Sequence, residues 1–221
     1  LLIGHLTIGV IGIYFLCRVY SCGVLASLVG ALACAGGSFW WCKAVNLGNM
    51  EGNAWIPFLL FAFLNGLACK SWRWAVLAGV FGALIVGVGA PHPVVYCAML
   101  SLFFWAWISR FHIDRQTAQY VLIIIVVAAG LSAWSWMPAA EYLSRSNRMS
   151  LGPEEAYQGA LALRDLPGVL LCGLTQPKVT RLDPWEGRLF FSITGLMLAG
   201  LGVVARKGRR ETWALLTAIV V

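Results

Sequence analysis

One group in this chain that could do chemistry at a surface is a histidine that stands between two prolines. Segment 87–96 reads G-V-G-A-P-H-P-V-V-Y. Pro91 would end a preceding helix and Pro93 suits the first turn of a following one, so we expect His92 to sit in a tight turn. An imidazole fixed there could donate a hydrogen bond to a phosphate or carry a proton. The alternative is an ordinary histidine in a turn between two helices.

A second polar group lies upstream, in segment 44–55, which reads A-V-N-L-G-N-M-E-G-N-A-W. Asn46, Asn49 and Asn53 offer amides and Glu51 offers a carboxylate, and such groups hold sugars or orient a phosphate. The alternative is a polar, glycine-bearing turn between helices. Asn49, Glu51 and Asn53 are therefore candidate substrate-binding residues together with His92.

Three charged side chains follow a long apolar run, in the segment M-P-A-A-E-Y-L-S-R-S-N-R at 137–148. If the helix continues past Pro138, then Glu141, Arg145 and Arg148 share one face at spacings i, i+4 and i+7. Two guanidinium groups beside one carboxylate could bind a diphosphate or a phosphate-sugar, because arginine presents a planar pair of donors. The alternative is a set of helix-end charges that meet water and each other.

The elements that must position these groups are strongly apolar. The chain has 221 residues, of which 60% are hydrophobic and 11% are charged, and its mean hydropathy is +0.80. Soluble domains carry about 25% charged residues, and disordered chains are charged and poor in aromatic residues. Seven apolar runs contain no Asp, Glu, Lys or Arg, and an eighth begins at Thr212. The seven are Leu1–Cys17, Gly23–Cys42, Ala54–Cys69, Trp74–Ala90, Val94–Ser109, Ala118–Ala140 and Leu189–Ala205.

Such runs are long enough, or nearly so, to cross a hydrocarbon core of about 30 Å. They must be helical there, because lipid offers no hydrogen-bond partner to the backbone. We therefore predict an all-α, polytopic transmembrane bundle with about seven full spans and a truncated eighth. Residues 1–143 would form a six-span region, 144–188 an extracytoplasmic loop with short interfacial helices, and 189–221 a truncated transmembrane hairpin. The first span lacks the features of a signal peptide, and we expect the chain to be an internal fragment of a longer protein.

The distribution of charge predicts the orientation. If the connections alternate between two sides, one side receives nine bases and two acids, and the other receives seven of each. The whole net charge of +7 then lies on one side, which the positive-inside rule makes cytoplasmic. His92, the 46–53 connection and the 144–188 loop would face outward. Because the excess bases sit in short loops beside spans, we predict a membrane partner and no nucleic acid.

Several common sites are missing from the sequence. The seven cysteines form no C-x-x-C pair and lie mostly in or beside apolar runs, so they are expected to pack as small apolar residues. No Walker motif, H-E-x-x-H or G-x-S-x-G is present. No metal ligand set or bound cofactor is predicted.

The order of several motifs resembles the bacterial YfhO family of multi-spanning membrane proteins, which is grouped with GT-C-type glycosyltransferases. The resemblance covers essentially the whole chain. Its motifs are H-L-T-I-G-V-I-G-I-Y, N-A-W-I-P-F-L-L, G-A-P-H-P, M-P-A-A-E-Y-L-S-R-S-N-R, L-P-G-V-L-L-C-G-L-T-Q-P and G-R-L-F-F-S-I-T-G-L. The family pattern around His92 usually reads Gly-His-Pro-Gln, whereas here Pro91 precedes the histidine and Val94 follows Pro93. The family's glutamine is therefore absent.

The resemblance implies a GT-C-like fold and a glycosyltransferase of the bacterial cytoplasmic membrane. Its donor would be a sugar linked to a polyprenyl phosphate, and its acceptor a polymer or lipid of the cell envelope. His92, Arg145 and Arg148 would bind the leaving phosphate, while Glu141 and the Asn49–Glu51–Asn53 segment would orient sugar or acceptor. The essential acid of GT-C enzymes lies in the first outward loop, so the catalytic residue is expected upstream of Leu1.

Two functions of other classes remain open. A transporter or flippase for a lipid-linked substrate predicts broken helices or charged groups at mid-membrane. The apolar runs carry no acid or base, which argues against ion-coupled transport but not against passive flipping. A non-catalytic scaffold of an envelope assembly would use the outward loop as a docking surface. Sugar and acceptor identity, metal dependence and oligomeric state do not follow from the sequence.

Overall fold

The computed structural model describes residues 1–36, 40, 47–109 and 114–145. Within these ranges the chain forms α-helices and no strand. The helices are α1 (Leu2–Val19), α2 (Val24–Ala35), α4 (Leu47–Cys69), α5 (Trp72–Gly87), α6 (Pro91–Ser109), α7 (Arg115–Leu131) and α8 (Ala133–Ser144). The predicted all-helical fold is therefore confirmed for the described part of the chain.

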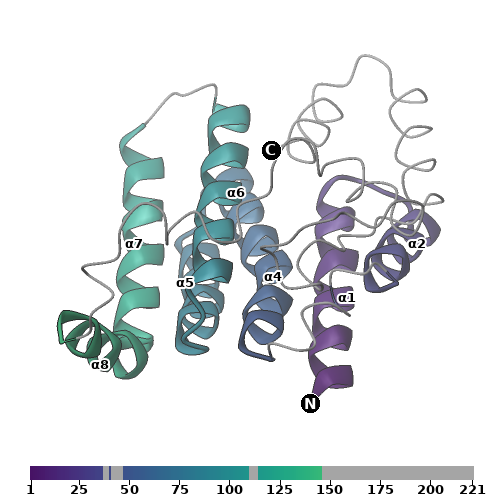
Figure 1. The fold of residues 1–221 in the computed structure, drawn as a ribbon. Helices are drawn as coiled ribbons and strands as arrows, with labels where there is room; N and C mark the ends of the chain where they lie inside the picture. Colours follow the sequence, from purple (N-terminus) through teal and green to yellow (C-terminus); the bar gives the residue numbers. More distant parts are fainter. Residues whose placement is uncertain (37–39, 41–46, 110–113, 146–221) are drawn as a thin grey trace, which may run out of the picture.

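Five long helices stand side by side, and α8 lies across the foot of α7 (Figure 1). Because α4, α5, α6 and α7 alternate in direction, α4 and α6 begin at the end of the bundle where α5 and α7 finish. We call this end the His92 end and the opposite one the Lys70 end. Of the described bases, Arg145 lies at the His92 end, whereas the others lie at the Lys70 end: Arg18, Lys70, Arg73 and Arg115.

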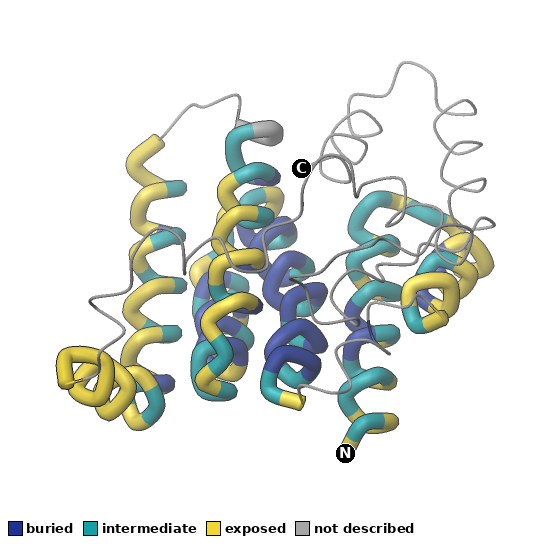
Figure 2. The backbone as a smooth tube through the Cα atoms, viewed as in Figure 1, coloured by how far each residue is buried: buried dark blue, intermediate teal, exposed yellow. Residues whose placement is uncertain are grey.

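Helix α4 is the centre of the bundle. Within its most apolar 18 residues, 61% are buried, compared with 11% for α1. The main core cluster takes Leu59, Leu60 and Phe63 from α4 and packs them against Ile85 of α5 and Phe104 of α6. Figure 2 shows the same pattern, with buried positions on α4 and α5 and exposed positions on the outer faces of α7 and α8.

Glycines set the closest helix crossings. A Cβ added to Gly79 on α5 would lie 2.6 Å from Val127 Cβ on α7, and one added to Gly82 would lie 3.2 Å from Ala128 Cβ. On the other side of α4, a Cβ on Gly12 of α1 would lie 2.8 Å from the ring of Phe58. These positions need glycine because the two backbones approach closely.

Tyr120 ties α7 to α4. Its hydroxyl donates a hydrogen bond to the carbonyl of Ala62 at 3.0 Å, and its ring packs directly on Gly66. The side chain is 6% exposed. A buried hydroxyl that has a partner avoids the desolvation penalty of an unpaired one, so Tyr120 fixes the height of α7 along α4.

Two predicted boundaries are wrong. The third apolar run was expected to begin at Ala54, but α4 already begins at Leu47, so the predicted polar connection at 46–53 is helical from Leu47 onward. The predicted single span Ala118–Ala140 is two helices, α7 and α8, bent by 76° at Ser132. The hydroxyl of Ser132 donates to the carbonyl of Ala128 at 2.6 Å, which takes up an acceptor of the last α7 turn where the helix stops.

The number of spans is only partly confirmed. Two helices, Leu2–Val19 and Leu47–Cys69, are long and apolar enough to cross a membrane, and the bent pair α7–α8 would make a third if it counts as one span. The runs at α2, α5 and α6 form shorter apolar helices. The predicted spans Leu189–Ala205 and the one from Thr212, together with the 144–188 loop beyond Arg145, lie outside the described residues.

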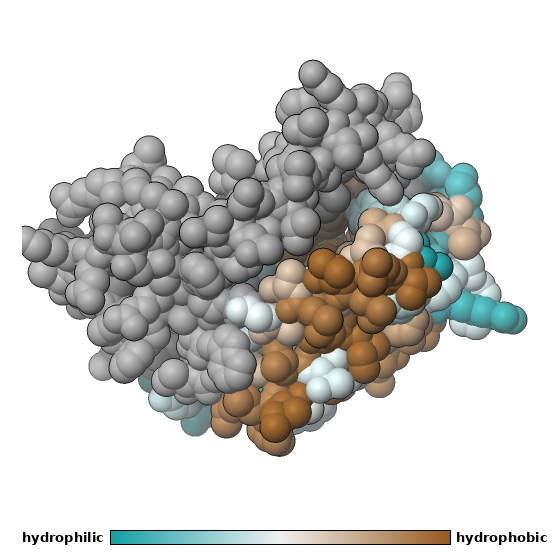
Figure 3. All heavy atoms as spheres, turned by 90° about the vertical axis from the view of Figure 1, so that its right-hand side faces the viewer, coloured by the Kyte–Doolittle hydropathy of each residue, from teal (hydrophilic) through white to brown (hydrophobic). Residues whose placement is uncertain are grey.

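The outer faces of the helices are apolar as well. On the face that carries α1 and α2, the described residues form a large hydrophobic patch with a few less apolar residues within it (Figure 3). Side chains such as Leu25 and Leu32 of α2 are 75% and 64% exposed. Contiguous apolar surface on this scale is unusual for a monomer in water and is typical of a surface that meets lipid or protein.

Candidate functional site

Helices α4 and α6 meet at the His92 end. A Cβ added to Gly52 would lie 2.8 Å from Cγ and 2.9 Å from Cβ of Pro93, so the first turns of the two helices touch there. The contact brings the segment Asn49–Asn53 next to the turn that carries His92. Two of the three sequence-predicted groups are therefore neighbours in space, although 39 residues separate Asn53 from His92.

His92 lies in the first turn of α6 and not in the expected tight turn before it. Pro91 is the first residue of α6, whereas it was expected to end the preceding helix, which already finishes at Gly87. The imidazole is exposed, and its ring lies 6.5 Å from that of Tyr96 one turn further along. Pro91 and Pro93 have no N–H, so this helix end offers fewer backbone donors than most. An anion at this position would depend mainly on the imidazole.

Asn49 and Asn53 lie inside the bundle rather than in a loop. They are 8% and 7% exposed, and the amide nitrogen of Asn53 donates to the carbonyl of Asn49 at 2.6 Å. One amide donor of Asn53 is thus used within α4, and its carbonyl oxygen remains as an acceptor. Glu51, between them, is half-buried. Asn49 and Asn53 are four residues apart and share one face of α4, whereas Glu51 lies on nearly the opposite face, because successive residues are about 100° apart.

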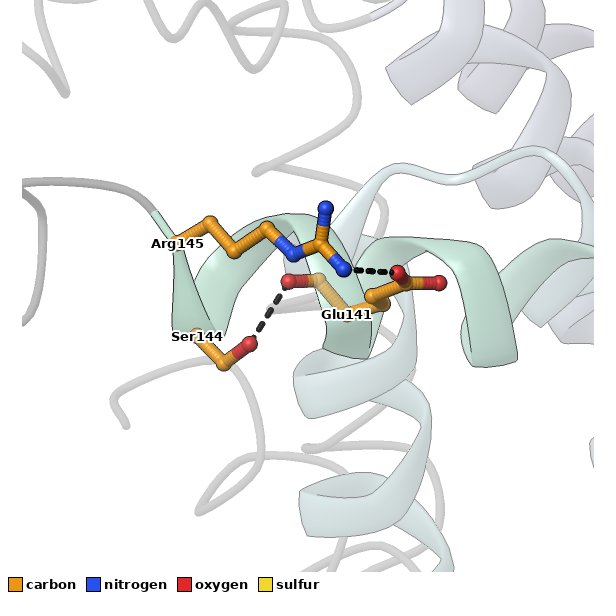
Figure 4. Close-up of polar contacts among 3 residues, drawn as sticks. All are labelled: Glu141, Ser144 and Arg145. Atoms are coloured by element: carbon orange, nitrogen blue, oxygen red, sulfur yellow. Dashed lines mark hydrogen bonds and ion pairs between the residues drawn. The ribbon is translucent and has the colours of Figure 1, made fainter.

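The acidic and basic groups of 137–148 lie on α8. The helix continues past Pro138 as far as Ser144, and Arg145 Nη2 lies 2.7 Å from Glu141 Oε1 (Figure 4). The Ser144 hydroxyl donates to the carbonyl of Glu141 at 2.7 Å. Glu141 and Arg145 therefore share one face of α8, as their spacing predicts, and they pair with each other, which is the alternative given above for these charges. Arg148 lies outside the described residues. Both paired side chains are largely exposed, at 77% for Arg145 and 65% for Glu141.

Helix α8 joins the His92 end through its first turn. Ser135 Oγ lies 3.4 Å from the carbonyl of Val86, and the indole of Trp134 approaches the Cα of Gly87, the last residue of α5. Glu141 and Arg145 follow two to three turns later along α8. The structure therefore places them at the same end of the bundle as His92, on a separate element.

A long apolar groove is the feature that the sequence did not predict. It has a volume of about 790 Å³ and lies between α6 and α7, with α4 and α5 as its floor. At the His92 end it is lined by Val94 and Ala128, and at the Lys70 end by Trp105 and Thr117. Val94 and Trp105 are eleven positions apart on α6, which makes the groove about 16 Å long at 1.5 Å per residue. The sequence gives no indication of the groove, because the residues that line it and the residues that pack between the helices are equally apolar.

The Lys70 end carries a smaller notch of about 250 Å³, whose lining includes Lys70, Asp114 and Gln116. Asp114 caps α7, accepting the backbone N–H of Thr117 at 2.9 Å. Hydrogen bonding from the Thr117 side chain and from its backbone N–H, with a smaller contribution from the charge of Lys70, holds the pKa of the Asp114 carboxyl below its ordinary value of 3.8. The amide of Gln116 donates to the carbonyl of Lys70 at 3.4 Å.

Among the residues placed by the structure, no three His, Cys, Asp or Glu side chains come together as metal ligands. The described cysteines are Cys17, Cys22, Cys34, Cys69 and Cys97, all as free thiols. Comparison of the chain with protein-family models, with curated proteins and with solved structures gives no match.

Proposed function

We propose that this chain belongs to a polytopic protein of the bacterial cytoplasmic membrane that transfers a sugar from a polyprenyl-phosphate donor to a cell-envelope acceptor at the outer face. In this proposal the His92 end faces outward and the Lys70 end faces the cytoplasm. The GT-C-like arrangement and the full count of seven spans plus a truncated eighth are part of the proposal. The proposal also includes a phosphate-binding role for Arg148 and an extracytoplasmic position for the 144–188 loop.

The observation that carries the proposal is the groove. It is apolar along its length, with Ser101 and Thr117 as its hydroxyl-bearing lining residues, and at the His92 end its lining begins at Val94, two residues after His92. A polyprenyl phosphate needs an apolar channel for its chain and a polar, solvent-accessible end for its phosphate and sugar. The order of these two features along α6 matches that requirement.

Each candidate residue has a distinct role. The exposed imidazole of His92 would donate to the phosphate as it leaves, where negative charge develops. Arg145, and Arg148 after it, would contribute guanidinium donors from α8, exchanging the bond to Glu141 for one to phosphate. Asn49, Glu51 and Asn53 would hold sugar or acceptor hydroxyls. The resemblance assigns the general base that deprotonates the acceptor to a carboxylate before Leu1.

A flippase would use the same groove, and the open flank of the groove between α6 and α7 favours it as the second candidate. Transporters commonly break their helices near mid-membrane to build a substrate site. Here the break at Ser132 lies at the end of α7, beside the bundle end rather than half-way along it. This position favours the transferase over the flippase.

The test is transfer from a radiolabelled polyprenyl-phosphate sugar to envelope acceptors in membranes that contain the natural protein. We expect labelled acceptor, and we expect the double variant Arg145→Ala, Arg148→Ala to lose it without losing expression. Labelled lipid that crosses the bilayer with no labelled acceptor would instead identify a flippase. Absence of both activities would leave the scaffold and exclude the proposal.

A further inference from the structure

Helix α8 has the length and direction of a helix that does not cross a membrane. Its twelve residues extend about 18 Å, well short of a hydrocarbon core of about 30 Å. It turns away from α7 by 76°. If α7 stands across a bilayer, α8 therefore lies nearly parallel to the bilayer surface. None of its side chains is buried in the bundle, and beyond its first turn α8 is exposed (Figure 2).

The sequence of α8 divides into two faces. Four apolar side chains recur at spacings i, i+3, i+4 and i+7, which place them on one stripe of the helix: Trp136, Ala139, Ala140 and Leu143. Glu141 and Arg145 lie on the opposite side, paired with each other. That side also carries Pro138 and, at the start of the helix, Trp134, whose indole lies against Gly87 of α5. Trp136 and Leu143 are 43% and 45% exposed, so the stripe is apolar and uncovered among the described residues.

A hydrogen bond fixes which way the stripe faces. The indole N–H of Trp136 donates to the carbonyl of Ala129 on α7 at 2.9 Å, so the stripe begins on the side of α8 that faces the body of α7. The surface of α7 above it is itself apolar and exposed, with Leu122, Ile125 and Val126 at 59%, 57% and 61%. The stripe therefore continues the apolar flank of α7 around the bend, while the Glu141–Arg145 pair points away from it.

We propose that α8 is an interfacial helix: its Trp136–Leu143 stripe inserts into the bilayer at the level where headgroups meet acyl chains, and the Glu141–Arg145 pair faces the headgroups and water. The proposal rests on the membrane embedding contained in the proposed function. Its occupant is phospholipid, because the stripe is continuous with the exposed face of α7 and begins with a tryptophan. Tryptophan is enriched at this depth because its ring is apolar and its N–H is polar.

The interfacial position of α8 determines the depth of Arg145 in the membrane. A helix of this kind buries its apolar face by about 5–10 Å at the boundary of headgroups and acyl chains. Arg145 is then held near the plane of the lipid phosphates, which is also the depth of a lipid-linked donor's phosphate. The bend at Ser132 thereby sets the height of the Glu141–Arg145 pair relative to His92.

The experiment measures the depth of single nitroxide labels in lipid nanodiscs, from collision rates with oxygen and with a water-soluble nickel complex. Labels go on Ala139→Cys in the stripe, on Glu141→Cys as the matched position opposite it, and on Val126→Cys in α7, each in the full chain with its native cysteines replaced by alanine. We expect the Val126 label to be deepest, the Ala139 label about 5–10 Å below the phosphates, and the Glu141 label in water.

Each other outcome is decisive. A deep Val126 label with an Ala139 label as wet as that at Glu141 would overturn the interfacial helix and leave the membrane embedding standing. Labels at Ala139 and Glu141 that are both shielded from oxygen and nickel would mean that protein, either a second copy or another part of this chain, covers α8. A wet Val126 label would overturn the embedding itself.

A second measurement works without cysteine replacement. Quenching by brominated lipids is compared between the native chain and Trp136→Phe. The difference between the two fluorescence signals is the contribution of Trp136. We expect lipids brominated near the headgroup to quench this contribution more strongly than lipids brominated near the end of the acyl chain. The opposite order, or no quenching by either lipid, contradicts the proposal even if the cysteine-free chain fails to fold.

Discussion

His92 is the side chain on which the proposed chemistry depends most directly. Its neighbours Pro91 and Pro93 have no N–H to offer an anion, so the ring must supply the hydrogen bond itself. The first turn of α6 keeps the imidazole exposed while Pro93 packs against Gly52 of α4. The residue is thus anchored by its backbone and free at its ring, as a group that meets a substrate must be.

Replacing this ring should affect transfer and leave folding intact. A hydrogen bond to a charged group contributes about 1.5–3 kcal/mol, so His92→Ala should lower the rate of sugar transfer about 10- to 100-fold. His5→Ala is the matched control, because the Nδ1 atom of His5 lies 3.1 Å from the carbonyl of Leu1, at the start of α1, a helix that takes no part in the α4–α6 contact. Equal loss in both variants, or none in His92→Ala, removes His92 from the mechanism.

Asp114 predicts a pH dependence at the other end of the bundle. Hydrogen bonding from the Thr117 side chain and from its backbone N–H keeps the pKa of the folded carboxyl below 3.8. Because the pKa of this carboxyl is lower in the folded than in the unfolded protein, the charged cap stabilises the fold at any pH above the unfolded pKa. This stabilisation is lost as the pH falls through the folded pKa. In Asp114→Asn the cap persists without a titrating group, so the variant should lose less thermal stability than the native chain between pH 6 and pH 3. Identical losses would contradict the capping role.

Features that depend on neighbouring residues in the sequence were easier to predict than the tertiary surroundings of a side chain. The first-turn position of Pro93 and the Glu141–Arg145 pair depend on local spacing, and both are present. Asn49 and Asn53 were expected in a polar turn because asparagine and glycine favour turns. They are instead buried in α4, between residues that pack in a tertiary cluster: Met50 and Ala54 contact Trp40. No local pattern indicates that cluster.

At the level of helices, glycines decide how closely the elements pack. Gly79→Ala would place a Cβ 2.6 Å from that of Val127. Overpacking of this kind costs about 1–3 kcal/mol, against a gain in helix propensity of at most about 1 kcal/mol. We expect a lower stability in detergent unfolding, and weaker contact between α5 and α7. Gly130→Ala on α7 is the control, since nothing lies within 4 Å of its Cβ, and it should be neutral or stabilising. Equal effects would argue against close packing at Gly79.

The two boundary errors have different local causes. The predicted span Ala118–Ala140 runs through Pro138, and α8 does continue through it, but the chain bends six residues earlier at Ser132. Gly52 reads as a turn residue, yet it lies inside α4, at a position where Pro93 leaves no room for a side chain. A pattern of apolar runs indicates neither the bend nor this contact between helices.

At the scale of the whole molecule, α6 and α7 stand apart over a floor of α4 and α5, and the gap between them is the groove. Tyr120 maintains this spacing by holding α7 at a fixed height on α4. The pairing of residues 58 positions apart could not be predicted from one sequence, and neither could the groove that results. The Lys70 end collects the described bases except Arg145, in agreement with the predicted division of charge between two sides.

Filling the groove should prevent donor binding without unfolding the bundle. Ala98 lines the groove and is exposed, so Ala98→Trp places an indole in the open channel. We expect the KM for the donor to rise at least about tenfold, which corresponds to about 1.4 kcal/mol. Met99→Trp is the matched control, because Met99 is 54% exposed and lies outside the groove lining. An unchanged KM in Ala98→Trp places the donor elsewhere.

The most direct measurement is photo-crosslinking with a polyprenyl-phosphate sugar that carries a diazirine in its chain, followed by mapping of the adducts in the protein. The groove account predicts adducts on α6 and α7, at lining residues such as Leu102 and Val121, and their suppression by unlabelled donor. Adducts confined to lipid-facing positions such as Leu25 of α2, unaffected by unlabelled donor, would contradict it.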